Sequence, residues 1–253
     1  MGLAIGSFLN VVIIRSVKGE SLRGRSYCRN CRTQLTAKEL IPLISFCVQK
    51  GRCRNCGAVL SRQYFWVELA SGFLFASAFY FLAKNFGFQL TAPFFWWLFF
   101  FWLLASLVII IFAADWRFQI IPHIPAIILF ILGAAATIYR NGWSFSSGLD
   151  FAAAFALSLF FFSLWLFSKG DWMGLGDAKL ILATSLLVGY PLSTVAFLFS
   201  FWLGGIVGAG LLLSGLKTKK SQIPFGPFIL LGAFMAYLIG EQFLVWSGLI
   251  YLL

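Results

Sequence analysis

The sequence is poor in charged residues and has almost no histidine. Only 11% of its 253 residues are Asp, Glu, Lys or Arg, against about 25% in an ordinary soluble domain. Hydrophobic residues make up 61% of the chain, which is more apolar surface than a water-soluble fold of this size can bury. The single histidine, His123, supplies no convincing Ser–His pair for catalysis, and we interpret it as a polar residue at a membrane interface. The bilayer must be the solvent for most of this chain.

Long apolar runs alternate with short breaks of Pro, Gly and charge. Lipid offers no partners for loose backbone, so these runs are expected to be helices. Residues 1–14 are shorter than the ~20 residues that a helix needs to cross the bilayer, and we expect them to be the end of a first span whose beginning is missing or misassigned. The pattern predicts an all-α polytopic membrane protein with about eight transmembrane helices, of which 178–190 and 242–253 are the uncertain ones. The other runs lie at 64–83, 92–114, 120–139, 147–168, 192–214 and 223–240.

Basic residues are concentrated in one polar segment, residues 15–62, which holds 11 of the 19 Lys and Arg. The net charge of +11 would suggest nucleic acid in a soluble protein, but here the excess of basic residues in cytoplasmic loops explains it better. Placing 15–62 in the cytoplasm and threading the spans puts 17 basic residues inside and leaves Lys84 and Arg140 outside. We therefore predict three parts, a partial span (1–14), a cytoplasmic loop domain (15–62) and a transmembrane domain (63–253), and no nucleic-acid partner.

Four cysteines of the polar segment form two CxxC pairs, Cys28/Cys31 and Cys53/Cys56. This spacing is typical of a tetrahedral four-sulfur Zn²⁺ site, which is usually structural. A polar loop of this length also needs an organiser because it cannot build a core. Four reduced thiols or two disulfides are the alternatives, and the inferred cytoplasmic side disfavours disulfides. We interpret the fifth cysteine, Cys47, as a small buried hydrophobic residue rather than a fifth ligand.

Two acids, Asp115 and Asp177, stand at the ends of apolar runs on the side assigned to the cytoplasm. An acid near hydrocarbon is costly unless it has a partner or a function. The structural alternatives are a helix-end carboxylate paired with Arg117 for Asp115 and a helix N-cap for Asp177. If the two carboxylates face each other they can share a proton, so that one activates water and the other polarises a carbonyl. The pair would then be the catalytic dyad of an aspartic protease.

Three further charged residues have weaker interpretations. Glu68, about one turn into its span, is either a buried functional or helix-pairing acid or a partner of Arg62. Asp171, between Gly and Trp, suits an ordinary turn. Lys179 could pair with phospholipid or tune the aspartates.

Across nearly its whole length, the chain resembles the bacterial type IV prepilin peptidases. The resemblance rests on GSFLNVVIIR (6–15), the two CxxC pairs around ELIPLISF (39–46), SRQYFWVE (61–68), GLGDAKL (174–180) and IPFGPF (223–228), in that order. It departs from the family at Phe65, where proline is common, and at His123, where a second acid is common.

The resemblance implies a multi-pass GxGD aspartic peptidase of the bacterial inner membrane. It would remove the basic leaders of type IV prepilins and of type II secretion pseudopilins after a glycine, at the cytoplasmic face. Carried onto this chain, it implies Asp115 and Asp177 as catalytic residues, the four paired cysteines as zinc ligands, and N-methylation of the new terminus with S-adenosylmethionine. No residue is assigned to that methyl donor, and the oligomeric state stays open. A zinc-stabilised membrane scaffold and a proton- or cation-coupled transporter are the alternatives.

Overall fold

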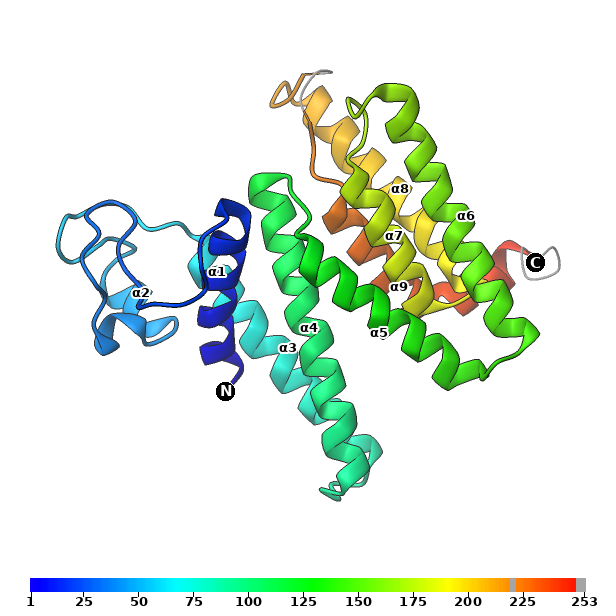
Figure 1. Ribbon diagram of the computed structural model, residues 1–253, viewed down its shortest axis with the longest axis horizontal. Helices are drawn as coiled ribbons and strands as arrows, with labels where there is room; N and C mark the ends of the chain where they lie inside the picture. Colours follow the sequence, from blue (N-terminus) through cyan, green and yellow to red (C-terminus); the bar gives the residue numbers. More distant parts are fainter. Residues whose placement is uncertain (219–221, 249–253) are drawn as a thin grey trace. The chain divides into compact units, whose positions relative to one another are not determined.

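A computed structural model of the chain describes residues 1–218 and 222–248. Within these ranges the chain is helical, with two isolated β-bridges and no strand, as the sequence predicts (Figure 1). Six of the helices are long and apolar enough to cross a membrane. They are α3 (Gln63–Asn85), α4 (Ala92–Phe118), α5 (His123–Asn141), α6 (Phe145–Ser168), α8 (Leu192–Leu213) and α9 (Gly226–Ser247).

The predicted count of about eight spans is not confirmed. Helix α1 (Gly2–Lys18) and helix α7 (Leu175–Val188) are not among these six candidates. With a rise of 1.5 Å per residue, the 14 residues of α7 reach about 21 Å, against about 30 Å of hydrocarbon.

Two helix ends also differ from the prediction. Helix α1 continues four residues beyond the predicted end at residue 14 and stops at Gly19, whose φ of 67° is left-handed. Residues 242–247, predicted as part of a separate short piece, continue α9. Residues 249–253 of that piece and two of the counted cytoplasmic lysines, Lys219 and Lys220, lie outside the described residues.

The long helices carry large apolar side chains on their outer faces. The most apolar 18-residue stretch of each candidate span is only 17% to 39% buried within the protein. On α4, for example, Trp96 is 74% exposed and Phe99 is 61% exposed. An apolar exterior of this extent suits lipid as the surrounding solvent and not water.

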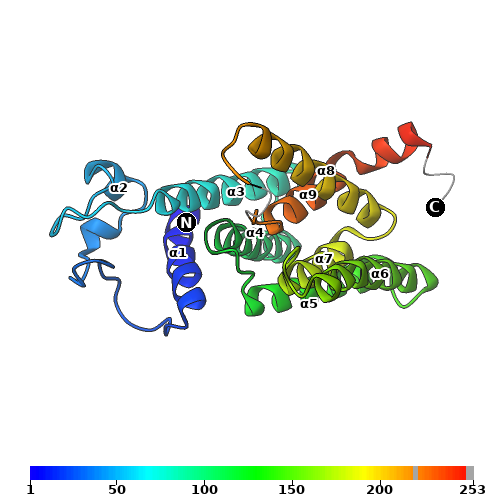
Figure 2. The same ribbon diagram turned by 90° about the horizontal axis from the view of Figure 1, so that it is seen from above.

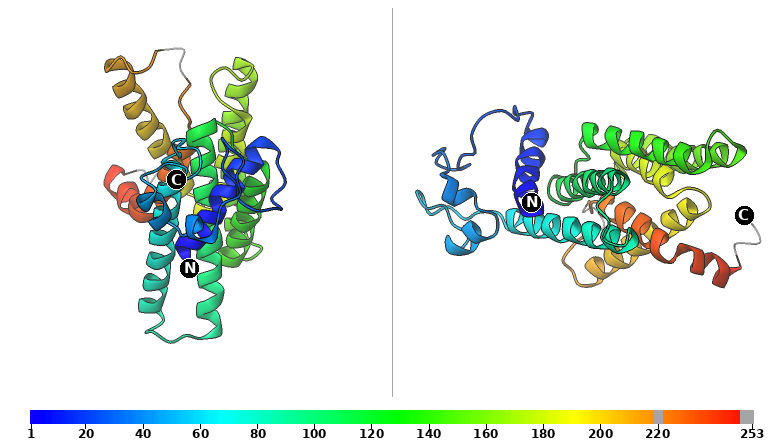
Figure 3. Two further views of the ribbon diagram at one scale, coloured as in Figure 1. Left: turned by 90° about the vertical axis from the view of Figure 1, so that its left-hand side faces the viewer. Right: turned by 90° about the horizontal axis from the view of Figure 1, so that it is seen from below.

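The chain divides into two compact units, Met1–Ala114 and Asp115–Leu253. In the first unit α1 lies against α3 (Figure 2), where the buried Asn10 side chain donates hydrogen bonds to the backbone oxygens of Gly6 and Tyr64. Helices α3 and α4 run side by side (Figure 3), joined by a hydrogen bond of 3.1 Å from Trp102 Nε1 to the Phe75 carbonyl. The cysteine segment between α1 and α3 contains two short helices, η1 (Ala37–Leu40) and α2 (Ile44–Val48).

In the second unit, α7 packs against α5, α6, α8 and α9. Close approach to α5 depends on Gly133, where a Cβ would lie 2.8 Å from the Ala183 carbonyl oxygen. From α6, the Ser158 hydroxyl donates a hydrogen bond of 2.9 Å to the Ala178 carbonyl. Because α7 is held on several sides, its first turn has a defined position, and that turn contains Asp177.

Candidate functional site

Asp115 lies three residues before the end of α4 and is buried, with 5% of its surface exposed. Its Oδ2 accepts a hydrogen bond of 2.9 Å from the backbone N–H of Gly226, the first residue of α9. A Cβ at position 226 would lie 2.7 Å from the same oxygen, so the carboxylate needs glycine there. The start of α9 thus supports a carboxylate that α4 positions.

Asp177 is also buried and lies in the first turn of α7. The proposed N-cap role is wrong in detail, because Gly174 is the N-cap and Asp177 is the third helical residue. Its Oδ2 accepts a hydrogen bond of 3.1 Å from the Gly174 N–H. A carboxylate in the first turn is favoured by the positive end of the helix dipole, so the GLGD sequence itself orients this acid.

The fold brings Asp115 and Asp177 together. The two carboxyl groups are close enough for the charge on Asp115 to act on Asp177, although 62 positions separate them in the sequence. Gly176 supports the approach, because a Cβ there would lie 3.0 Å from the Cβ of Ile121 in the turn after α4. In that turn, Gln119 Nε2 donates a hydrogen bond of 3.1 Å to the Gln222 carbonyl, just before α9.

The four paired cysteines form one cluster in the first unit, and their sulfur atoms all lie within 4.8 Å of one another. The two pairs have the same local structure, since the N–H of Cys28 bonds to the Thr33 carbonyl and that of Cys53 to the Ala58 carbonyl. The sequence contains a signal for this shared local structure, since the tetrapeptide Cys-Arg-Asn-Cys occurs at both 28–31 and 53–56. The spacing of the cysteines alone did not reveal this repeat.

Each asparagine of this repeat contacts a sulfur of the other pair. Asn30 Nδ2 donates to Cys56 Sγ, and Asn55 Nδ2 donates to Cys31 Sγ, both at 3.6 Å. The Thr33 hydroxyl and the Asn55 amide together lower the pKa of the Cys31 thiol to about 5. The Asn30 amide lowers the pKa of Cys56 in the same way.

The cluster has the donor chemistry and spacing of a tetrahedral metal site. A Zn–S bond of about 2.3 Å in a tetrahedron places neighbouring sulfurs about 3.8 Å apart, and the Sγ atoms of Cys28 and Cys56 are 3.9 Å apart. The backbone N–H groups of Cys31 and Asn30 favour the thiolate of Cys28. Burial and the adjacent thiols outweigh them and raise the pKa of Cys28 to about 11. Four thiolates this close therefore need a bound cation to be stable together. The residues fit a metal ion.

Cys47 departs from its interpretation. It belongs to α2 and is exposed rather than buried. Because α2 has only five residues and contains no buried one, it offers no core in which a small hydrophobic residue could be enclosed. The other part of the interpretation agrees with the structure, because Cys47 is not among the four clustered sulfurs.

Glu68 is buried in the first unit, where its Oε2 accepts a hydrogen bond of 2.8 Å from the backbone N–H of Leu43. The acid therefore ties α3 to the cysteine segment, and a side-chain hydrogen bond with Ser7 also links it to α1. The hydrogen bond is made to the N-cap residue of α2, Leu43, whose backbone has a positive φ of 60°.

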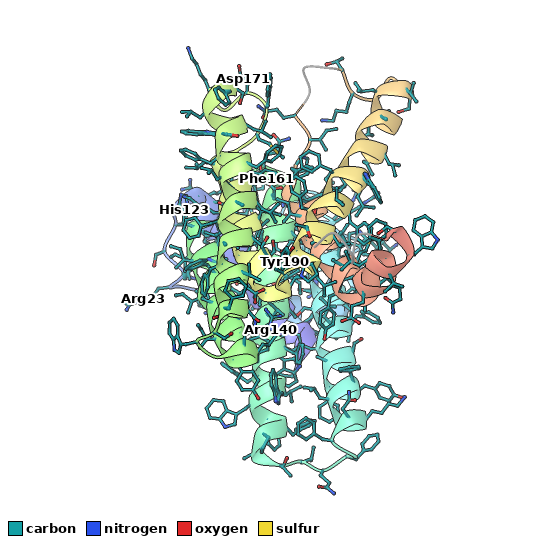
Figure 4. All side chains as sticks on the ribbon, turned by 90° about the vertical axis from the view of Figure 1, so that its right-hand side faces the viewer. Arg23, His123, Arg140, Phe161, Asp171 and Tyr190 are labelled. Atoms are coloured by element: carbon teal, nitrogen blue, oxygen red, sulfur yellow. The ribbon has the colours of Figure 1, made fainter. Side chains whose placement is uncertain are left out.

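Three residues of the second unit can also be compared with their interpretations. His123 is exposed at the start of α5, and its Nδ1 lies 3.4 Å from Lys179 Nζ. Asp171 is exposed after α6, and its N–H bonds to the Ser168 carbonyl, as expected for a turn. Figure 4 shows Asp171 at the end of α6 away from Arg140.

A buried acid that the sequence reasoning missed is Asp150, near the start of α6. Its Oδ1 accepts from the Tyr190 N–H at 2.7 Å, and its Oδ2 accepts from Asn141 Nδ2 at 2.9 Å. Arg140, 3.8 Å from Asp150, donates to three carbonyls at the end of α7. The sequence feature that indicates this site is an acid, Asp150, inside an apolar run, with a basic residue, Arg140, ten positions earlier. This network holds the end of α7 that lies away from Asp177.

Six long helices with exposed apolar faces and two buried carboxyl groups that act on each other define the class, a polytopic membrane protein with a pair of buried aspartates. Comparison with known proteins then gives the family. Residues 1–82 match the Bacterial Peptidase A24 N-terminal domain, and residues 102–209 match the Type IV leader peptidase family. The chain belongs to this leader peptidase family, which confirms the resemblance in the sequence.

Curated relatives match along most of their length. A prepilin leader peptidase/N-methyltransferase of Bacillus subtilis (strain 168) is 34% identical over 242 residues, which cover 95% of this chain and 92% of the relative. Proteins of the same description from Aeromonas hydrophila and Pseudomonas aeruginosa are 30% and 28% identical, over 96% of this chain and 90% and 89% of their own lengths. No solved structure gives a significant match to the chain.

Proposed function

We propose that this protein cleaves the leader peptides of type IV prepilins and pseudopilins, with Asp115 and Asp177 as the catalytic pair. The observation that carries the proposal is that these two acids, far apart in sequence, are buried and interact in one unit. The relatives that are similar over almost the whole chain are described as prepilin leader peptidases. Their descriptions supply the substrate class, which the geometry of the aspartates alone does not.

The proposed chemistry is the hydrolysis of a peptide bond by an aspartate pair. Two carboxyl groups that act on each other in a buried site can share one proton, because both cannot easily be ionised together. The ionised carboxylate takes a proton from a water molecule, whose oxygen attacks the scissile carbonyl. The protonated carboxyl donates a hydrogen bond to the carbonyl oxygen and stabilises its developing negative charge. Proton transfer to the leaving nitrogen then completes cleavage of the C–N bond.

The proposed site faces the cytoplasm in the bacterial inner membrane. The distribution of charge supports this side, because a topology in which residues 178–190 also cross the membrane places 17 of the 19 basic residues in the cytoplasm. A prepilin substrate would present its basic leader at the same surface and keep its apolar helix in the bilayer. The scissile bond would then meet the aspartates at the membrane boundary.

Zinc is the metal that we propose for the cysteine cluster. Cys28, Cys31, Cys53 and Cys56 would hold the ion, and it would stabilise the fold of segment 15–62 without entering the hydrolytic chemistry. The same segment lacks an apolar core, since η1 and α2 contain no buried residue. A metal ion would therefore replace packing as its organiser.

We also propose that the protein transfers a methyl group to the new N-terminus, since the relatives are described as N-methyltransferases. S-adenosylmethionine would supply the methyl group. The described residues include no strand, so they do not form the strand–turn–helix that binds nucleotides in many folds. We assign none of them to the methyl donor.

The test of cleavage uses the purified full chain and a prepilin in mixed micelles. Asp115→Asn and Asp177→Asn should each lower the rate by at least about a thousandfold, as expected when a group that acts with its partner is lost. The matched control is Asp171→Asn, an exposed acid of the same unit, which should cleave like the parent. Cleavage by either dyad variant at the parental rate would overturn the proposal and favour a scaffold or a transporter.

A further inference from the structure

A cavity in the first unit is lined by basic and aromatic side chains and by no acid. The cavity is wide open to its surroundings, and its volume is about 500 Å³. Its basic residues come from the end of the cysteine segment and the start of α3. They are Lys50, Arg52 and Arg62.

The aromatic side chains of the cavity form a connected cluster. The Phe46 and Phe65 ring centroids are 5.8 Å apart, and those of Phe65 and Trp66 are 5.5 Å apart. Phe46 also covers Gly51, where a Cβ would lie 3.2 Å from the ring. The cluster connects α2 to the first turn of α3, so the cavity is a feature of the folded segment and not of one flexible side chain.

The cavity lies at the end of a candidate membrane span. Arg62 is the N-cap of α3, and Trp66 is in its first turn with 61% of its surface exposed. Tryptophan and basic residues at the end of a span mark the level of the lipid headgroups. Three cations without a lining carboxylate favour an anion, and a cluster of basic side chains beside a span is typical of sites for anionic headgroups.

We propose that this cavity binds the phosphate headgroup of an anionic glycerophospholipid. The aromatic wall would contact the glycerol and the upper acyl chain, while Lys50, Arg52 and Arg62 would bind the phosphate. A basic peptide would be repelled by the three cations, and a sulfonium cofactor carries positive charge at its reactive centre. This inference concerns a different site from the aspartate pair and does not depend on peptidase activity.

Cys47 provides a reporter at the site, since it lines the cavity and is exposed. The full chain is placed in nanodiscs of phosphatidylcholine with or without phosphatidylglycerol, and alkylation of Cys47 by the uncharged reagent N-ethylmaleimide is followed by mass spectrometry. Phosphatidylglycerol should slow the labelling at least fivefold. Lys50→Gln/Arg52→Gln/Arg62→Gln should abolish this protection, because each basic residue near an anionic surface contributes about fivefold to binding.

The matched control removes the same charge elsewhere in the segment. Arg23→Gln/Arg25→Gln/Lys38→Gln alters three basic residues that do not line the cavity and should keep the protection. If Arg52→Gln disturbs the adjacent Cys53, Lys50→Gln/Arg62→Gln leaves the cysteine turn intact and should still lose most of the protection. Native mass spectrometry of the parent should retain phosphatidylglycerol in preference to phosphatidylcholine.

Three results would overturn the proposal. Unchanged labelling in phosphatidylglycerol would show that no lipid occupies the cavity. Equal loss of protection in both triple variants would indicate general surface attraction and no defined site. Protection by inorganic phosphate in discs of phosphatidylcholine alone would assign the cavity to a free anion.

Discussion

The backbone N–H of Gly226 donates a hydrogen bond of 2.9 Å to Asp115 Oδ2, so the first residue of α9 supports a buried carboxylate at the end of α4. This contact joins positions 111 residues apart. The contact explains the glycine of the IPFGPF sequence. Gly226 is required because the Asp115 carboxylate lies beside it, and not because the chain turns there.

Gly226→Ala should reduce cleavage strongly. Its Cβ would lie 2.7 Å from Asp115 Oδ2, so the carboxylate or the start of α9 must move. A displacement of about 1 Å at a reacting group can cost about a hundredfold in rate, and we expect a loss of that order in kcat with little change in KM. Gly205→Ala on α8, where nothing lies within 4 Å, is the matched control and should keep parental kinetics.

Gly176→Ala should separate activity from stability. Alanine favours a helix by about 1 kcal/mol over glycine, but its Cβ would lie 3.0 Å from Ile121 Cβ and push the turn after α4 away from Asp177. We expect kcat to fall about tenfold while the thermal unfolding temperature in detergent is unchanged or higher. Gly148→Ala on α6 adds a methyl group in open space, and a similar fall in its kcat would contradict this explanation.

Asp150→Asn should destabilise the second unit. The amide cannot accept from both the Tyr190 N–H and the Asn141 side chain, so one partly buried donor loses its partner. The free energy of unfolding should fall by about 1–3 kcal/mol. Loss of the ion pair between Arg140 and Asp150 adds little to this, because the Arg140 side chain is 38% exposed and solvent screens its charge. Denaturant unfolding in micelles measures the free energy. Asp171→Asn, at an exposed position, should change the unfolding free energy by less than about 0.5 kcal/mol.

Glu68→Leu should loosen the cysteine segment at α2. The Leu43 N–H would lose its acceptor, which costs about 1–3 kcal/mol for a buried donor. Hydrogen exchange at residues 41–48 should therefore become faster. Glu68→Gln keeps an acceptor oxygen and should retain most of the protection, so equal exchange in the two variants would indicate that the hydrogen bond does not hold this segment.

Cys28→Ser/Cys31→Ser should lose the metal ion. Two of the four clustered sulfurs would be replaced, and a hydroxyl is a much weaker zinc ligand than a thiolate. Metal analysis should give about one zinc per chain for the parent and close to none for the variant, with faster proteolysis of segment 15–62. Cys47→Ser is the control, because Cys47 lies outside the cluster. Stoichiometric zinc in the double variant would remove the assignment.

Local patterns in the sequence were enough for much of the architecture. Uninterrupted apolar runs require helices because lipid cannot satisfy the backbone, and the described residues are helical. The two CxxC pairs predicted a cluster of four sulfurs because the ligand spacing is encoded within a few residues, and the sulfurs do lie together. Helix α7 was less certain because 14 residues are too few to identify a span by length.

Tertiary structure decided which polar residues are buried and what they contact. The sequence indicated Asp115 and Asp177 as costly acids near hydrocarbon, but only the fold of the second unit brings their carboxyl groups within range of each other, with Asp115 beside Gly226. Asp150 was missed and Cys47 was misplaced because their burial depends on neighbours that are distant in sequence. Composition and spacing determine the solvent and the local turns of this chain, whereas long-range packing creates the aspartate pair.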